Sequence, residues 1–281
     1  MQTFPLSGKT KLVPILAHPV DHVRAPRSYN PAFAAAGLDW HMMPMGVAPQ
    51  DLAATLAQLA RVTNLQGVNL TIPHKAAAYA LCTRVTAEAR DTGMANTLRK
   101  EEGGQWSGAN SDGIGFIGAA RAHGLLDIAK PVVIVGSGGA GTAIAFALAA
   151  AGVKEIDVLD TDAARSTHLL QTLAKRFHGL ACSNRRDALT RAGLTVNATP
   201  LGLKEGDPLP FDPAELPEGS ALFDIIAARD TELMAAAAQR GLRVLGGRPM
   251  VEHQLAHQIA FWRGGAGQHT DDNSIPTEPR Q

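Results

Sequence analysis

The sequence lacks an excess of charge of either sign. Its 281 residues include 26 Lys plus Arg and 26 Asp plus Glu, so the formal net charge is zero. Proteins that bind nucleic acids or anionic membrane surfaces usually do so through clustered positive charge, and the sequence has no extended Lys/Arg run. We therefore expect neither a nucleic acid nor a membrane as a partner.

Cysteine is also scarce. Cys82 and Cys182 are the two present, far apart in the chain, and they form neither a disulfide framework nor a metal-binding spacing. His253 and His257 resemble part of an H-E-x-x-H zinc motif, but Gln254 stands where the general base belongs and cannot abstract a proton. We expect a reducing compartment and no metal site.

Long apolar runs are missing as well. The first residues, MQTFPLSGKTKLVPIL, have no apolar core long enough for a signal peptide, and no run approaches the ~18 apolar residues of a membrane span. These absences predict a soluble, cytoplasmic protein.

What the first half does contain is an alternation of strand-like and helix-like segments. The apolar run 11–17 predicts a buried strand, 28–38 a helix that Gly37 ends, 38–47 another strand, and 50–62 a helix with apolar residues at helical spacing. Strands that alternate with helices are typical of an α/β domain with a largely parallel sheet.

The second half repeats this alternation more regularly, which predicts a doubly wound, nucleotide-binding α/β domain. Its expected strands and helices are 131–153 (strand, glycine turn and helix), 155–162, 163–177, 194–201, 220–227, 230–241 and 242–247.

A glycine-rich turn follows the first strand of this half and opens a helix. In a G-x-G-x-x-G fingerprint the glycines permit a tight turn, a close backbone approach to a pyrophosphate, and close helix–strand packing, while the helix N-terminus favours the phosphate charge. The residues expected at a dinucleotide here are Gly136, Gly138, Gly139, Ala140 and Gly141.

Asp160 ends the next strand, about 20 residues after the glycine turn. A carboxylate at this place accepts hydrogen bonds from an adenosine ribose and repels a 2′-phosphate, and the first arginine beyond it is Arg165. The pattern favours NAD over NADP. The alternative is a solvated acid beside a purely structural glycine turn.

Lys75 lies where the strand-like segment 67–72 passes through Pro73 into an alanine-rich helix. Helix N-termini slightly disfavour cations, so a lysine at this position is unusual. It is either a solvated surface cation or a proton carrier.

Several short motifs then occur in one order: GVNLTIPHK (67–75), GMANTL (93–98), GANSDGIGF (108–116), the glycine turn, NATPLG (197–202) and MVEHQ (250–254). In this order they resemble the shikimate dehydrogenase family, which includes quinate/shikimate dehydrogenases, over about 13–264. The resemblance implies hydride transfer between a nicotinamide and a ring hydroxyl.

The resemblance also implies a division of the chain, with the active site in a cleft between two α/β domains. We expect a substrate-binding catalytic domain of residues 1–113 plus 247–264, a Rossmann dinucleotide-binding domain of residues 114–246, and a flexible tail of residues 265–281.

For the chemistry, the resemblance assigns Lys75 and Asp112 as the catalytic pair. Oxidation of a secondary alcohol requires a proton to leave the oxygen as the hydride leaves the carbon, and an ammonium beside a carboxylate can accept, donate or relay that proton.

The resemblance assigns the remaining site residues to two groups. The substrate-side residues are Asn69, Thr71, Asn96 and Gln254, and two further residues at the cofactor are Thr199 and Gly247. Neutral amides both donate and accept hydrogen bonds, which suits ligand hydroxyls. The alternative roles are turns or caps for the asparagines and a polar helix face for Gln254.

The chain departs from the family where a Ser-x-Ser pair usually holds the substrate carboxylate. Val23 and Ala25 occupy those positions, with Arg24 between them and Arg27 beyond. Because a carboxylate without donors is costly in a cleft, either an arginine, with Arg24 the first candidate, binds it bidentately, or the ligand differs. Ser28 and Tyr29 are other candidate donors.

The leading hypothesis is therefore an NAD-dependent oxidoreductase for shikimate, quinate or a related cyclic hydroxy acid. One alternative is a catalytically weak protein that binds NAD and a metabolite as a sensor, and another is a dehydrogenase for a different cyclitol. The exact substrate, the direction of flux and the choice between monomer and homodimer stay open.

Overall fold

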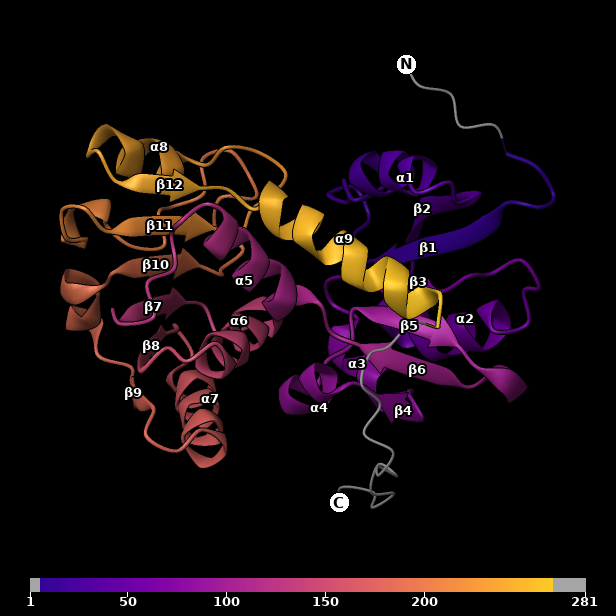
Figure 1. Ribbon diagram of the computed structural model, residues 1–281, viewed down its shortest axis with the longest axis horizontal. Coiled ribbons are helices and arrows are strands. Elements are labelled where there is room, and N and C mark those ends of the chain that lie inside the picture. The colour runs from indigo at the N-terminus through magenta and orange to yellow at the C-terminus, as the bar shows by residue number, and fades with distance from the viewer. Residues whose placement is uncertain (1–5, 265–281) are drawn as a thin grey trace. The chain divides into compact units, whose positions relative to one another are not determined.

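The computed structural model describes residues 6–264, which form two compact units (Figure 1). The first contains the described residues up to Ser111 together with those from Leu255 onward, and the second is Asp112–Gln254. The expected tail, 265–281, lies outside the described residues.

The first unit has a six-stranded sheet in the order β2-β1-β3-β5-β6-β4. Its strands are β1 (Lys11–Ala17), β2 (Trp40–Gly46), β3 (Val68–Leu70), β4 (Arg84–Val85), β5 (Thr97–Lys100) and β6 (Trp106–Ala109). Its helices are α1 (Pro26–Ala35), α2 (Leu52–Leu59), α3 (Lys75–Ala80) and α4 (Ala87–Thr92), with short 3₁₀ turns at Pro49–Asp51 and Glu102–Gly104.

This sheet has more parallel than antiparallel strand pairs, and it contains both kinds. Strand β1 runs parallel to β2 and β3, whereas β5 is antiparallel to both β3 and β6. Gly103 and Gly104, with φ of 73° and 76°, supply the left-handed backbone of the connection between β5 and β6, and antiparallel strands can be joined by so short a loop. The expectation from the first half of the sequence missed this hairpin.

A cluster of aromatic rings packs part of the first unit. Phe33 on α1, Trp40 on β2 and Trp262 lie with ring centroids 5.5–6.4 Å apart in edge-to-face pairs. The indole N–H of Trp262 donates to the Leu98 carbonyl at 3.1 Å. A Cβ on Gly67 would overlap the Trp262 ring, so the indole can pack at this position only because residue 67 is a glycine.

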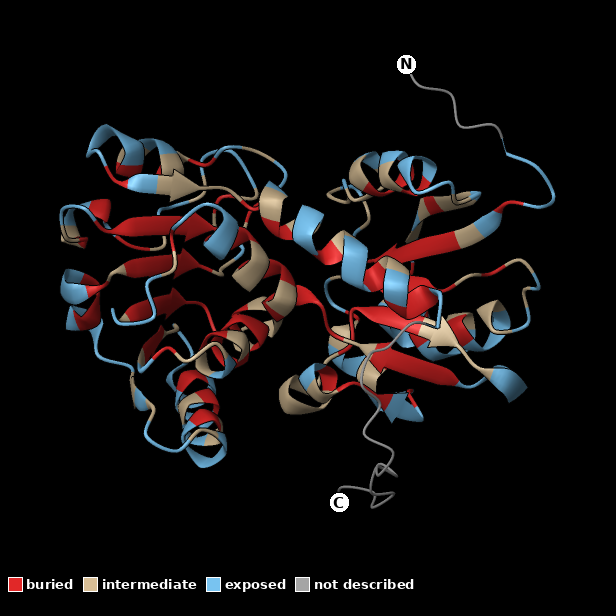
Figure 2. Ribbon diagram, viewed as in Figure 1, coloured by how far each residue is buried: buried red, intermediate tan, exposed pale blue. Residues whose placement is uncertain are grey.

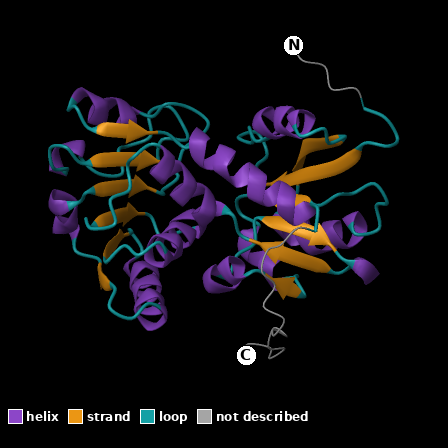
Figure 3. Ribbon diagram, viewed as in Figure 1, coloured by secondary structure: helices purple, strands orange, loops and turns teal. Residues whose placement is uncertain are grey.

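The second unit is a doubly wound parallel sheet, as the sequence predicts (Figure 3). All its strand pairs are parallel, in the order β12-β11-β10-β7-β8-β9. The strands are β7 (Val132–Val135), β8 (Glu155–Leu159), β9 (Ala181–Ser183), β10 (Leu194–Asn197), β11 (Ala221–Asp224) and β12 (Arg243–Leu245). The helices are α5 (Asp112–Ala122), α6 (Gly139–Ala150), α7 (Ala163–Arg176) and α8 (Glu232–Gln239), with 3₁₀ turns at Arg186–Arg191 and Pro213–Glu215.

Both faces of this sheet are covered. Along β7, Val132 and Ile134 join the core beneath α5 and α6, while Val133 and Val135 join a separate core that includes Leu233 of α8. Strand residues alternate between faces, so the continuous apolar run of this strand suits a sheet buried on both sides. Figure 2 shows the central strands β7, β10 and β11 as buried, whereas the edge strands β9 and β12 are partly exposed.

Helix α9 (Arg248–Trp262) begins in the second unit and ends in the first. In the first unit the Gln66 side chain donates to the Trp262 carbonyl at 2.6 Å, and Arg99 donates to the Phe261 carbonyl at 3.0 Å. None of the helices within residues 6–264 combines the length and apolarity needed to span a bilayer.

Candidate active site

The glycine turn between β7 and α6 has the shape that a dinucleotide phosphate requires. Gly136 has a φ of 102°, which favours glycine, and a Cβ on Gly141 would overlap the Gly136 carbonyl. At Gly138, by contrast, nothing lies within 4 Å of the position of a Cβ, so the backbone there is open to a ligand. Together with the N-terminus of α6, this turn fits a pyrophosphate.

Asp160, the acid after β8, is bound to the glycine turn. Its Oδ2 accepts the backbone N–H of Ser137 at 2.7 Å and the Ser137 hydroxyl at 2.6 Å, and its Oδ1 accepts the N–H of Asp162 at 2.9 Å. Burial alone would raise the pKa of this carboxyl, but these hydrogen bonds and the charge of Arg165 lower it. The carboxylate is thus engaged within the protein, with 8% of the side chain exposed.

Arg165, on the first turn of α7, is the exposed cation of this cluster. Its Nη2 lies 3.2 Å from the Asp162 carboxylate and its Nη1 lies 3.9 Å from Asp160, while 54% of the side chain is exposed. A guanidinium beside the acid after β8 is suited to a 2′-phosphate on the adenosine ribose.

A second polar cluster lies at the carboxyl ends of β10 and β11. Oδ1 of Asn197 accepts the N–H and the hydroxyl of Thr199 at 3.1 and 2.7 Å, while its Nδ2 donates to Asp224 at 3.2 Å. Asp224 also accepts the Thr231 hydroxyl at 2.7 Å, and burial raises the pKa of its carboxyl. These bonds fix the loop that carries Thr199, beside the switch point between β7 and β10 where such folds bind ligands.

Gly247 packs against the loop that leaves β11. Its N–H donates to the Ile226 carbonyl at 3.0 Å, and a Cβ at this position would overlap the Ile225 carbonyl. Glycine is therefore required here by backbone packing. The sequence analysis missed the Asn197–Asp224 pair, although polar residues at the ends of two apolar parallel strands are a usable signal.

In the first unit, three segments that carry expected site residues lie side by side. Lys75 is half-buried at the start of α3, and its carbonyl accepts the N–H of Ala95 at 3.0 Å. The next residue, Asn96, accepts the N–H of Ser111 on its Oδ1 at 3.1 Å. Asp112 follows Ser111 directly and opens α5 in the second unit, with 5% of its surface exposed.

Asn69 and Asn96 belong to one buried hydrogen-bond network. Oε1 of Gln258 accepts the Tyr29 hydroxyl at 2.6 Å and Nδ2 of Asn69 at 2.9 Å, and its Nε2 donates to the Ser111 hydroxyl at 2.6 Å. That hydroxyl donates to Asn96 at 3.2 Å. The sequence analysis missed Gln258, which lies four residues after Gln254 on α9 and therefore on the same helix face.

Thr71 and Gln254 lie in different units. The Thr71 carbonyl accepts the N–H of His74 at 2.9 Å, so this residue shapes the turn before α3. Gln254 is buried, and Gly115 on α5 leaves room for its Cγ, which a Cβ on that glycine would overlap.

Arg24 is directed to its own loop. Its Nη1 donates to the carbonyls of Asp21 at 2.5 Å and Val23 at 3.2 Å, and the residue is exposed. Arg27 is exposed as well. Val23 and Ala25 offer no side-chain donors in place of the two hydroxyls that the family usually has here, and the Arg24 guanidinium donates to carbonyls of its own loop.

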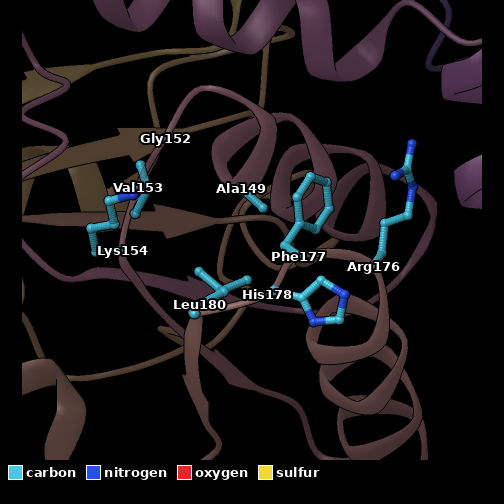
Figure 4. Close-up of a pocket in the computed structure, with 9 residues that line it drawn as sticks. Ala149, Gly152, Val153, Lys154, Arg176, Phe177, His178 and Leu180 are labelled. Atoms are coloured by element: carbon cyan, nitrogen blue, oxygen red, sulfur yellow. The ribbon is translucent and has the colours of Figure 1, made fainter.

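A surface pocket of about 250 Å³ lies elsewhere in the second unit (Figure 4). It is lined by Lys154, Arg176, Phe177 and His178, among others, and precedes the amino end of β8. The glycine turn follows the carboxyl end of the parallel strand β7, so the pocket and the glycine turn lie at opposite ends of the strands. Among the described residues, no three His, Cys, Asp or Glu side chains are grouped to hold a metal ion.

Comparison with known proteins gives consistent results. Residues 15–98 match the family model of the shikimate dehydrogenase substrate binding domain. The shikimate dehydrogenases (NADP(+)) of Rubrobacter xylanophilus and Acidiphilium cryptum are 36% and 40% identical, over 92% of this chain and 93% and 92% of theirs. The structure of shikimate 5-dehydrogenase from Thermus thermophilus with NADP(H) and shikimate has a TM-score of 0.82 at 31% identity, covering 91% of this chain and 94% of that one.

These findings overturn the expectation of NAD over NADP. Both relatives are named for NADP(+), and the Thermus structure contains NADP(H). The physical reason is that Asp160 is turned toward Ser137 and the glycine turn, while Arg165, which the spacing argument discounted, is exposed beside it.

The resemblance and the α/β fold class predicted from the sequence are confirmed by the family match and by the similarity of structure. The chain belongs to the shikimate dehydrogenase family and is an oxidoreductase that transfers a hydride.

Proposed function

We propose that this protein interconverts a ring ketone and a ring hydroxyl of shikimate or a closely related cyclic hydroxy acid, with NADP(H) as the preferred dinucleotide. The observation that carries the proposal is the clustering, in the first unit, of the Lys75, Asn96 and Ser111 segments, from which the chain passes directly to Asp112. The relatives named above support the choice of substrate and dinucleotide.

The second unit supplies the residues for the dinucleotide. The open backbone at Gly138 and the N-terminus of α6 would hold the pyrophosphate, and Arg165 would pair with a 2′-phosphate. When bound, the dinucleotide supplies or accepts the hydride. Thr199, fixed by Asn197, would lie on the nicotinamide side of the loop after β10.

Lys75 would move the proton that accompanies the hydride. In the direction of reduction, its ammonium donates a proton to the ketone oxygen while the carbon receives the hydride, and the amine regains a proton from water. In the direction of oxidation, the amine accepts the hydroxyl proton. Asp112 would hold the ammonium in position for the transfer.

Neutral side chains would orient the ring. Asn69, Asn96, Thr71 and Gln254 offer amide and hydroxyl groups, which recognise ring hydroxyls without adding charge. Fixing the ring beside both the proton donor and the nicotinamide lowers the entropic part of the barrier.

The test is a steady-state assay of purified protein with NADP⁺ and NAD⁺ against shikimate, quinate and uncharged cyclitols. We expect NADPH formation with at least one cyclic hydroxy acid. Tight dinucleotide binding without turnover of any substrate would contradict the proposal and favour a sensor.

A second candidate substrate is an uncharged polyhydroxylated ring. Val23 and Ala25 carry no hydroxyls, and the Arg24 guanidinium donates to the Asp21 and Val23 carbonyls. The test compares shikimate with an analogue in which a hydroxymethyl group replaces the carboxylate. An equal or better kcat/KM for the analogue favours this candidate, whereas a shikimate preference that disappears in Arg24→Ala excludes it.

Assembly and location stay predictions. We expect a monomer or homodimer in the cytoplasm, and gel filtration coupled to light scattering measures the first of these.

A further inference from the structure

Gln258 on α9 joins three other buried polar side chains in the first unit. Its own exposure is 1%, and its carboxamide contacts the Tyr29 hydroxyl, Nδ2 of Asn69 and the Ser111 hydroxyl at 2.6, 2.9 and 2.6 Å. A buried amide that is hydrogen-bonded at both of its polar atoms has little freedom to rotate, because each lost hydrogen bond leaves a desolvated polar atom.

The hydrogen bonds of this network run in one direction, from Asn69 through Gln258 and Ser111 to Asn96. The N–H of Ser111 can only donate, and it donates to Oδ1 of Asn96 at 3.1 Å. The Ser111 hydroxyl donates to the same oxygen at 3.2 Å, so its own oxygen is the acceptor for Nε2 of Gln258. With Nε2 directed to Ser111, Oε1 of Gln258 receives Nδ2 of Asn69.

The two asparagines consequently differ in the atoms that the protein already uses. Oδ1 of Asn96 accepts from Ser111 twice and from the Thr97 hydroxyl at 2.8 Å, so its acceptor atom is occupied within the protein. Asn69 uses Nδ2 for Gln258, so it offers a ligand its Oδ1 as an acceptor.

We propose that Gln258 is a positioning residue that fixes Asn69 as a hydrogen-bond acceptor and thereby selects the hydroxyl pattern of the substrate. This inference rests on the proposed function, in which Asn69 meets a ring hydroxyl. Gln258 itself touches Asn69 and Ser111 and acts through them.

A double-mutant cycle tests whether Gln258 acts through Asn69. We expect Gln258→Leu to lower kcat/KM for the substrate about tenfold, mainly through KM, and to lower it less than about twofold in an Asn69→Ala background. The exposed neighbour on α9, His257→Ala, serves as the matched control and leaves kcat/KM unchanged. An equal effect of Gln258→Leu in both backgrounds, or none in either, overturns the proposal.

A second readout needs no substrate. In protein with ¹⁵N-labelled asparagine, we expect the side-chain NH₂ protons of Asn69 to exchange slowly with solvent, and Gln258→Leu to speed this exchange about tenfold or more. Ser111→Ala is a smaller buried change that should also speed the exchange of the Asn69 protons, and it replaces Gln258→Leu in this test if that variant does not fold. His257→Ala should leave the exchange rate unchanged. Unchanged exchange in Gln258→Leu, or in Ser111→Ala where it stands in, overturns the proposal. Absence of turnover in the wild type overturns only the proposed function.

Discussion

Ser137 donates two hydrogen bonds to one carboxylate oxygen of Asp160, from its backbone N–H at 2.7 Å and from its hydroxyl at 2.6 Å. The acid after β8 is thereby tied to the turn that precedes α6. An acid so engaged cannot also turn both oxygens to a ribose, and Arg165 is the exposed cation beside it, where we propose that the adenosine binds.

Arg165→Ala should therefore reverse or level the cofactor preference. We expect kcat/KM for NADPH to fall about 10- to 100-fold, the worth of a charge-assisted contact to a phosphate, with little change for NADH. Initial rates with both dinucleotides measure this.

The matched control is Arg185→Ala, which removes an exposed guanidinium that pairs with Asp187 on the same unit. It should leave the NADPH/NADH ratio unchanged. An Arg165→Ala enzyme with the wild-type ratio would show that another group reads the 2′-phosphate.

Asp160 should also contribute a pH-dependent part of stability. Its pKa is lowered in the folded state, so the ionised carboxylate stabilises the fold above the ordinary aspartate pKa of about 4, and this contribution is lost as the pH falls through the lowered value. In urea unfolding at a series of pH values, the stability difference between wild type and Asp160→Asn should shrink below about pH 4. A difference that stays constant with pH would contradict this.

Lys75→Met should remove proton transfer while keeping the length of the side chain. We expect kcat to fall about 10²- to 10⁴-fold, the usual worth of a general acid–base group, with KM for NADPH nearly unchanged. Lys9→Met, at an exposed lysine of the same unit, is the control. Retention of more than about a tenth of the wild-type kcat would exclude Lys75 as the proton carrier.

Gly67→Ala tests the packing of α9 on the first unit. The added methyl group would overlap the Trp262 indole and lie 2.7 Å from the Leu98 carbonyl, so we expect a loss of about 1–3 kcal/mol in the free energy of unfolding. Gly8→Ala is the control, because nothing lies within 4 Å of its Cβ position. Equal stability of both variants in chemical denaturation would contradict the packing described.

Local patterns made much of the fold predictable. The alternation of strands and helices in the second half and the glycine turn are each determined by residues close together in the chain. Both are present in the structure at the expected positions. Lys75 stood out for the same reason, as a cation at the start of a helix. The family resemblance added Asp112 and the substrate-side amides, whose roles stay proposals.

Long-range pairings were not predictable from local pattern. Asn69 and Gln258 are 189 positions apart, and Tyr29 and Gln258 are 229 apart, so no spacing in the sequence connects them. The sequence analysis also missed the orientation of the Asp160 carboxylate. The position of a residue at the end of a strand determines where its Cα lies, whereas its hydrogen-bond partners determine where its side chain points.

The most direct test of the account is the fate of the hydride. NADPH that carries deuterium at the transferable C4 position should reduce the ring ketone to an alcohol that holds one deuterium on its carbinol carbon, detected by mass spectrometry and NMR. A product without deuterium on that carbon, formed at the normal rate, would contradict hydride transfer from the nicotinamide to the ring.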